Sequence, residues 1–220
     1  AFSKDGKTMY FTRNNYNDGK KGKSSDKVTL LKIYKATLEG DKWTNVTELP
    51  FNNNNYSVAH PALSPDGKTM YFASDMPGTL GQSDIFKVSI NADGSFGTPE
   101  NLGPKINTPG RESFPFVSDE NELYFASDGQ LGLGGFDIFV SKIGNDGSIK
   151  EVKNIGEPAN SKKDDFAYII NSKTRIGFLS SNRDGGNGND DIYKFVETKR
   201  LEFECEQLLA GTITDLETGA

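Results

Sequence analysis

The sequence repeats itself at an interval of about 53 residues, and this repeat constrains the fold more than any other feature. Four copies of one short apolar segment carry a shared aromatic residue, at separations of 61, 53 and 53 positions: Phe11, Phe72, Phe125 and Phe178. A second segment follows each copy, and it carries Ile33, Ile85, Ile138 and Ile192. Two weaker apolar segments complete each unit. We therefore expect four short strands per unit, with the four Phe residues as equivalent buried positions of the second strand.

Tight turns separate the first two strands of each unit. In Ser64–Gly67 the turn reads Ser-Pro-Asp-Gly, which favours a hairpin. The chain contains 24 Gly and 9 Pro, residues that disfavour helix interiors. A four-stranded antiparallel unit repeated at this interval is the blade of a β-propeller. The sequence therefore predicts an all-β propeller made of four-stranded antiparallel blades.

Composition excludes several classes of protein. The net charge is −6, and lysines are scattered among the acids, so no nucleic-acid partner is expected. No apolar run approaches the length of a membrane helix, so no membrane-spanning segment is expected. Cys205 is the only cysteine, which excludes an internal disulfide framework and a cysteine-rich zinc site.

The segment Ser64–Ser74, followed by Ser83–Phe86, resembles the TolB-type repeat, the Pro-Asp variant of the WD-like propeller repeat. The resemblance extends over residues 1–198. It departs from the pattern at Lys32, which replaces the acid before the isoleucine, and at Asn171–Thr174, which replaces the Pro-Asp-Gly turn. Because propellers of this family close with six or more blades, the resemblance implies that the four repeats are part of a larger propeller.

The pattern changes after the fourth repeat. Leu201–Glu206 alternates apolar and acidic residues, which predicts a half-exposed strand. Leu209–Gly219 resembles the opening strand and turn of a carboxypeptidase regulatory-like β-sandwich. The expected organisation is therefore propeller blades over 1–200, a connecting or closing strand over 201–208 and the start of a β-sandwich over 209–220.

A TolB-like propeller that runs into such a sandwich resembles the OmpA-family envelope proteins of Bacteroidota, which include a component of the type IX secretion system. The resemblance implies a periplasmic, outer-membrane-associated scaffold with protein partners in an envelope complex. In that family a C-terminal OmpA-like domain binds peptidoglycan. That domain is not among these residues, so contact with peptidoglycan is expected only through it.

Motifs of enzyme active sites are absent from the sequence. His60 is the only histidine, and there is no G-x-S-x-G elbow, P-loop or H-E-x-x-H motif. His60 precedes Pro61 at the position that Phe114 and Ala167 take in later repeats, so we expect it to pack within a blade. The arginines fall at non-equivalent positions and do not predict a sialidase-type cluster. We expect that the chain is not an enzyme; the alternative is a carbohydrate-binding or glycosidase-type propeller.

Acidic residues end the connections between the second and third strands. The stretch Ser181–Asp191 alternates oxygen donors and glycines, as calcium loops do, whereas its counterparts keep mainly the final acid. Asp84, Asp137 and Asp191 are expected to accept hydrogen bonds from turn amides, with no cofactor; bound Ca²⁺ is the alternative. Glu112 and Asp165 precede inner strands and are expected either to line an acidic channel mouth or to lie under a helical or loop cover.

The connection Asn14–Leu30 in the first repeat is longer than its counterparts. It carries four lysines that we predict to form a partner-binding loop: Lys20, Lys21, Lys23 and Lys27. Loops of a propeller vary while its strands are committed to packing, so an insertion in one blade marks a candidate contact site; the alternative is a solvated loop. This loop and the Asn182–Asp191 connection both join second and third strands, and we expect them on the same side of the disc.

Overall fold

The computed structural model describes residues 1–17, 20–22, 24 and 27–203. Every regular element in these ranges is a β-strand. In chain order, the strands are β1 Thr8–Asn14, β2 Tyr16–Asn17, β3 Lys20–Lys21, β4 Leu31–Glu39, β5 Lys42–Glu48, β6 Val58–Leu63, β7 Thr69–Ser74, β8 Asp84–Ser89, β9 Glu100–Asn101, β10 Glu112–Val117, β11 Glu122–Ser127, β12 Asp137–Ile143, β13 Ile149–Asn154, β14 Asp165–Ile170, β15 Ile176–Ser181 and β16 Asp191–Val196.

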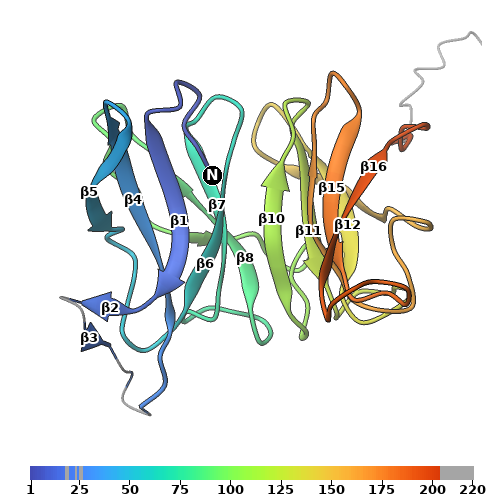
Figure 1. The fold of residues 1–220 in the computed structure, drawn as a ribbon, viewed down its shortest axis with the longest axis horizontal. Coiled ribbons are helices and arrows are strands. Elements are labelled where there is room, and N and C mark those ends of the chain that lie inside the picture. Colours follow the sequence, from blue (N-terminus) through green and yellow to red (C-terminus); the bar gives the residue numbers. More distant parts are fainter. Residues whose placement is uncertain (18–19, 23, 25–26, 204–220) are drawn as a thin grey trace, which may run out of the picture.

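These strands form four antiparallel sheets that follow one another along the chain. In order, they are β1-β4-β5, β6-β7-β8-β9, β10-β11-β12-β13 and β14-β15-β16, which we call the first to fourth blades. We call the first strand of a blade its inner strand; the inner strands are β6, β10 and β14. In the first blade, an isolated bridge between Phe2 and Met9 stands in place of this strand. Figure 1 shows the blades side by side, and the small hairpin β2-β3 projects from the first one. The prediction of an all-β fold built from propeller blades is therefore confirmed.

The hydrophobic core is divided among the junctions between neighbouring blades. One cluster joins the first and second blades around Leu49 and Phe72, a second joins the second and third around Tyr71 and Phe125, and a third joins the third and fourth around Tyr124. Strand residues alternate between two faces, so the second and third blades each have one apolar face for the preceding blade and one for the next.

Within the described residues there is no helix long and apolar enough to cross a bilayer.

Two of the four predicted core residues are fully buried. Phe72 and Phe125 are 0% and 1% exposed, whereas Phe178 is 40% exposed. Phe11 is half-buried, because no described blade covers the face of the first blade on which it lies. The expectation of four equivalent buried positions is therefore wrong for Phe11 and Phe178.

The error at Phe178 comes from turn length. The turn before β11 closes from the amide of Ser118 to the carbonyl of Glu122 and is one residue shorter than the turns before β7 and β15, which close from Ser64 to Thr69 and from Asn171 to Ile176. A shift of one residue reverses the face on which every following side chain lies. Leu179, which is 3% exposed, therefore occupies the position of Phe125 in the fourth blade. The pairing agrees, because Leu179 lies opposite Tyr193 as Phe125 lies opposite Phe139.

In the first three blades, asparagines that were not predicted from the sequence connect the segment after the fourth strand to the third strand; Asn107 and Asn160 are buried and Asn52 is half-buried. The side chain of Asn107 accepts from the backbone amide of Ile85 and donates to its carbonyl, at 2.8 and 3.0 Å. Asn160 makes the same two bonds to Ile138, and Asn52 makes them to Ile33. Each asparagine amide thus replaces a missing strand neighbour and satisfies buried backbone groups.

Two glycines allow close contact between one blade and the backbone of the next. A Cβ atom at Gly81 would lie 2.3 Å from the carbonyl oxygen of Thr108, and one at Gly134 would lie 2.1 Å from that of Lys163. Next to these glycines, the amide of Glu112 donates to Ser83 and that of Asp165 donates to Phe136. The glycine-rich connections are therefore part of the blade junctions.

The predicted connecting strand is described only at its start. Leu201 and Phe203 pack against the third core cluster, and the ammonium groups of Lys142 and Lys153 lie over the Phe203 ring. Residues 204–208 and the predicted sandwich segment 209–220 lie outside the described residues. The assignment of these segments stays a prediction.

The register difference predicts unequal effects of the two phenylalanines on stability. Replacing Phe125 by Ala should lower the free energy of unfolding by about 3 to 5 kcal/mol, because a buried ring leaves a cavity between two blades. Replacing the half-exposed Phe178 by Ala should cost about 1 kcal/mol or less. Urea unfolding of both variants measures the difference. Equal losses would contradict the assigned register.

Candidate functional site

The inner strands of the last three blades share a distortion in their backbone. His60, Phe114 and Ala167 have left-handed φ angles of 55°, 52° and 52°, and each lies at a break in the pairing of the inner strand with its neighbour. Positive φ is uncommon for residues other than glycine, and a bulge of this kind redirects the side chain. The sequence alignment of these three positions is confirmed, and all three line one pocket.

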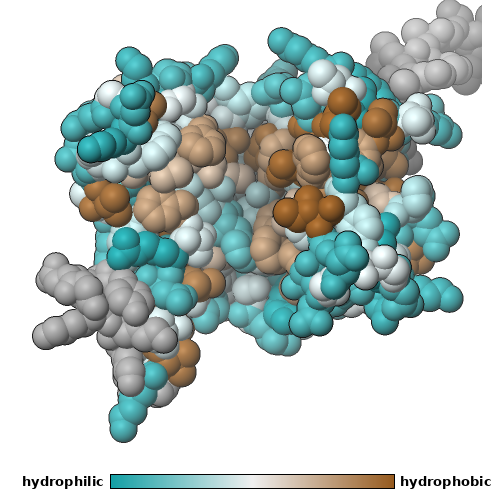
Figure 2. Space-filling model, viewed as in Figure 1, coloured by the Kyte–Doolittle hydropathy of each residue, from teal (hydrophilic) through white to brown (hydrophobic). Residues whose placement is uncertain are grey.

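This inner-strand pocket has a volume of about 650 Å³, within the range of small-molecule sites. Its lining comes from the inner strands β6, β10 and β14, from the turns that follow β6 and β10, and from the first residues of the chain. Figure 2 shows apolar residues gathered around a hollow in the middle of this face. The pocket is therefore the principal candidate site in the described part of the chain.

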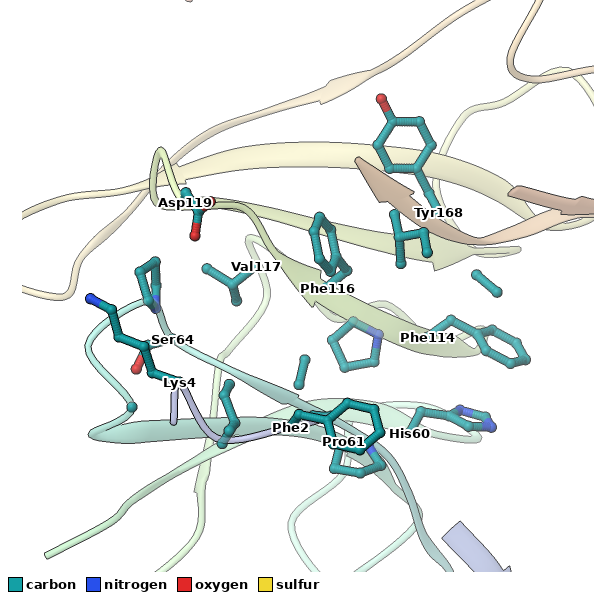
Figure 3. Close-up of a pocket in the computed structure, with 18 residues that line it drawn as sticks. Phe2, Lys4, His60, Pro61, Ser64, Phe114, Phe116, Val117, Asp119 and Tyr168 are labelled. Atoms are coloured by element: carbon teal, nitrogen blue, oxygen red, sulfur yellow. The ribbon is translucent and has the colours of Figure 1, made fainter. Parts of the chain in front are cut away.

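An aromatic surface forms one end of the pocket. The rings of His60 and Phe114 stack with centroids 4.0 Å apart, and the Phe166 ring lies 4.9 Å from Phe114. Polar groups lie toward the other end in Figure 3, where Lys4, Ser64 and Asp119 are drawn. The arrangement offers flat apolar contact at one end and charged groups at the other.

His60 is held in a neutral form by its surroundings. Its Nδ1 atom lies 2.8 Å from Ser113 Oγ, and its backbone amide donates to Thr12 Oγ1 at 2.8 Å. Burial lowers the pKa of His60 to about 4, since the charged ring would lose water without gaining a carboxylate partner. Burial also raises the pKa of Tyr168, at the pocket wall, to about 12. Neither of these side chains changes charge near neutral pH.

The contact between His60 and Ser113 was not visible in the sequence, because the two residues are distant along the chain. A histidine beside a serine hydroxyl is also the arrangement of an activated nucleophile. Ser113 is buried, however, and does not belong to the described pocket lining. The low pKa of His60 further disfavours proton uptake by its ring. This pair therefore acts as a cross-blade contact in the present geometry.

Each connection between the second and third strands of the last three blades ends in an aspartate that accepts hydrogen bonds from the amides of the same connection. Asp84 accepts from the amides of Leu80 and Gly81, and also from the side chain of Asn101 at 2.6 Å. Asp137 accepts from the amides of Leu133 and Gly134, and Asp191 accepts from those of Asn187 and Gly188. These carboxylates organise their own loops.

The candidate calcium loop uses several of its oxygens in hydrogen bonds. Asn182 accepts from the amide of Asp164 and donates to its carboxylate, while Asp191 Oδ2 receives two loop amides. Within the described residues no group of three or more His, Cys, Asp or Glu side chains is arranged to hold a metal ion. The geometry thus contributes no support for a calcium site at this loop.

Glu112 and Asp165 do not line a channel mouth; of the two expected alternatives, the structure shows the loop cover. Both are 0% exposed. Glu112 accepts from Ser127 Oγ and from the amide and hydroxyl of Thr108, and Asp165 binds Ser161 and the Arg183 guanidinium. They are buried because the preceding loop folds over the start of each inner strand and donates its polar groups to the carboxylate.

The predicted partner-binding loop contains a short hairpin. Lys20 and Lys21 form β3, which pairs with β2. Lys27 is exposed and has a φ angle of 63°, and Lys23 lies outside the described residues. In Figure 1 the hairpin lies at the end of the first blade, away from β10, one of the strands whose residues line the inner-strand pocket. The pocket and the lysine loop are therefore separate candidate surfaces.

The fold is that of β-propeller blades, and TolB-like propellers are among the solved structures that it resembles. A protein assigned as TolB from Agrobacterium tumefaciens matches with a TM-score of 0.55 and 18% identity, covering 88% of this chain and 62% of that one. TolB from Acinetobacter baumannii matches with a TM-score of 0.50 and 18% identity, covering 86% of this chain and 38% of the other. The chain thus spans less than two thirds of the length of either TolB structure.

Enzymes share the same architecture. An α-L-arabinofuranosidase from Lactobacillus brevis matches with a TM-score of 0.56 and 12% identity, covering 87% of this chain and 70% of that one. No protein-family model matches the sequence. A search of curated proteins finds no match either. At these identities the comparisons establish the fold alone.

The prediction that the chain is not an enzyme is wrong as an inference from the sequence. Besides the arabinofuranosidase, a puromycin-hydrolysing peptidase from Mycobacterium tuberculosis matches with a TM-score of 0.50. The prediction relied on missing motifs, whereas enzymes are found among the proteins that share this propeller fold. The fold therefore gives no reason to exclude catalysis.

The environment of His60 predicts a pH-dependent stability. Its pKa is about 4 in the folded protein and near 6.5 when unfolded, so the unfolded chain binds the proton first as the pH falls. The contribution of neutral His60 to the free energy of unfolding is complete above about pH 6.5 and should decline, by up to about 3 kcal/mol, as the pH falls toward 4. Urea unfolding between these pH values measures it. In His60→Phe, which copies the residue at position 114, this part of the pH dependence should disappear; an unchanged slope would contradict the assignment.

Proposed function

We propose that this chain forms a propeller scaffold that mediates protein–protein contacts in a bacterial cell-envelope assembly. The proposal rests on the connection between the second and third strands of the first blade, which is built differently from the corresponding connections of the other blades. In the other blades a terminal aspartate closes a compact connection. In the first blade Lys32 takes that position, and the connection is extended by the hairpin β2-β3.

The substitution at Lys32 is accompanied by a second one. Lys32 is 4% exposed and its ammonium group lies 2.9 Å from the carboxylate of Glu48. In the second blade the corresponding pair is Asp84 and Asn101, whose side chains are 2.6 Å apart. The acid that would fold the connection back is thus replaced by a lysine that binds the outer strand instead. This frees the longer loop to extend from the scaffold.

The sequence resemblance is also the basis on which we propose a cellular location and a protein family. A periplasmic, outer-membrane-associated protein of the OmpA family of Bacteroidota, such as the type IX secretion component PorE, combines a TolB-like propeller with a regulatory-like sandwich. The TolB-like architecture of the blades supports the first half of that combination. Peptidoglycan contact would require the OmpA-like domain of such a protein.

A second candidate is a carbohydrate-binding or glycosidase-type propeller, and the inner-strand pocket favours it. The stacked rings of His60 and Phe114 offer a flat surface of the kind that sugar rings contact. Glycoside hydrolysis ordinarily needs two carboxylates, and Asp119 is the only one among the described residues that line this pocket. Arabinoside turnover that is lost on replacing Asp119 by Asn would favour this candidate over the scaffold.

Shortening the insertion tests the scaffold. Cutting Asn14–Leu30 to the length of the Ser74–Ser83 connection should leave the melting temperature nearly unchanged, since the entropy of loop closure varies slowly with loop length. Recovery of envelope partners with the tagged full-length protein should fall. A second variant, with Lys20, Lys21, Lys23 and Lys27 changed to Ser, keeps the length and isolates the charge.

The matched control changes Leu80 to Ser in the corresponding connection of the second blade, where this side chain is 52% exposed. Partner recovery should be normal for this control. Wild-type recovery with the shortened protein would contradict a contact role for the insertion.

A further inference from the structure

Exposed apolar side chains gather on one side of the disc, at positions that further blades would not cover. Apart from Phe2 and residues of the strands, every exposed large apolar side chain of the described residues lies on a connection between second and third strands. They are Val28, Leu80, Leu131 and Leu133, which are 54%, 52%, 98% and 46% exposed. Additional blades extend a propeller at the outer faces of its terminal blades, so they leave these connections open.

These connections emerge from the same side of the disc, which we call the connection face. Strands pair antiparallel within every blade, so the connections between second and third strands leave the same end of each blade. They also contact the loops that lead into the next blade, because the amide of Gln82 donates to the carbonyl of Gly110 and that of Gly135 donates to Lys163. The connection face is the lower side of the molecule in Figure 1, from which the hairpin β2-β3 projects.

Buried aspartates hold the backbone at two of these leucines. The amides of Leu80 and Leu133 donate to the carboxylates of Asp84 and Asp137, which are 0% and 1% exposed. An amide without a partner is costly in an apolar environment, and these two amides already have one. The leucine side chains can therefore leave water without taking an unbonded amide with them.

Basic residues accompany the apolar side chains on the connection face. Four lysines lie on its connections and loops: Lys20, Lys21, Lys27 and Lys162. Two acids of this face are bonded within the protein, since Asp128 accepts from the Arg111 guanidinium and Asp164 accepts from the amide of Phe136. The connection of the fourth blade differs, because it has Asn187 at the position of Leu133. The apolar part of the face is therefore limited to the first three blades.

We propose that the connection face docks on a lipid bilayer with anionic headgroups, where the leucines and Val28 enter the interface and the lysines contact lipid phosphates. A bilayer is favoured over a protein partner because these side chains project singly from separate connections and none of them lines the inner-strand pocket. A fluid interface accepts projecting side chains without a complementary shape, and nearby lysines add attraction to anionic lipids. The proposal is independent of the proposed envelope partners, because it requires only these loops and lipid.

Flotation of the purified protein with vesicles tests the proposal. The protein should float with phosphatidylcholine vesicles that contain phosphatidylglycerol, more weakly with phosphatidylcholine alone, and less as the salt concentration rises. Changing Leu131 and Leu133 together to Ser should lower partitioning about tenfold, because two inserted side chains are lost. Changing the four lysines to Ser should remove the additional binding to the anionic vesicles.

The matched control changes Ile169 and Ile192 to Ser, since these side chains are 48% and 77% exposed on the fourth blade, away from the connections. This variant should float as the wild type does. An equal loss in both variants would indicate unspecific adsorption of apolar surface and would overturn the proposal. Wild-type protein that floats with neither kind of vesicle would overturn it too, and would leave a protein as the partner of this face. Partner recovery should stay normal in the leucine variant, which separates this proposal from the scaffold role.

A fluorescent label measures which part of the protein enters the lipid. In a protein with Cys205 changed to Ser, an environment-sensitive dye is attached to Leu131→Cys or, on the opposite side of the disc, to Ala92→Cys. With anionic vesicles the emission at position 131 should shift to shorter wavelength and the emission at position 92 should not. A dye at position 131 that stays in water while the protein floats would show that another surface binds, and would contradict the proposal. Circular dichroism and urea midpoints show that each variant is folded.

Discussion

The packing of one blade against the next is the interaction on which the rest of this structure depends. A single sheet of three or four short strands cannot bury its apolar residues by itself, and here each core cluster draws side chains from two neighbouring blades. The hydrophobic contribution is therefore shared by pairs of blades, as in other repeat proteins. Polar contacts reinforce it, because the backbone of the connection in the second and third blades is bonded to the start of the next inner strand.

This dependence explains where polar residues are buried. Glu112, Asp165 and the asparagine side chains are enclosed by the junctions, and each satisfies backbone amides or hydroxyl groups that the strand ladder leaves free. A buried carboxylate without such donors would be costly. Their role is to complete the scaffold, whereas the inner-strand pocket and the lysine loop are surfaces that the scaffold carries.

The repeat made the fold predictable, because its spacing, its turns and its alternating apolar residues all indicate the same unit. What it could not predict is the register of the fourth blade. The interval of 53 residues aligns Phe178 with Phe125, and only the closing bond of the turn at Ile176 reveals that Leu179 is the true counterpart. The turn of the third blade is one residue shorter than those of the second and fourth blades, and this difference leaves the apolar pattern almost unchanged while it exchanges the two faces in a 53-residue alignment.

The candidate site was less predictable than the fold. The alignment of His60 with Phe114 and Ala167 was correct, but its consequence was not visible, because stacking and the contact with Ser113 depend on the bulges that bring neighbouring inner strands together. The environment of Glu112 stayed open between two alternatives for a related reason. Its position in the repeat was clear, but its burial depends on Thr108 in a loop that folds over it.

At the three bulges of the inner strands the backbone conformation is the same while the side chains differ, so the backbone shape of the pocket does not depend on the chemistry of these side chains. The left-handed backbone is the same at positions 60, 114 and 167, although the side chains there are an imidazole, a phenyl ring and a methyl group. A backbone that accepts such different side chains at one repeated position lets the wall of the pocket diverge one blade at a time, without altering the strands behind it. Relatives of this chain can thus acquire new ligands through substitutions at these three sites, and the same sites offer protein engineers a small combinatorial library on an unchanged framework.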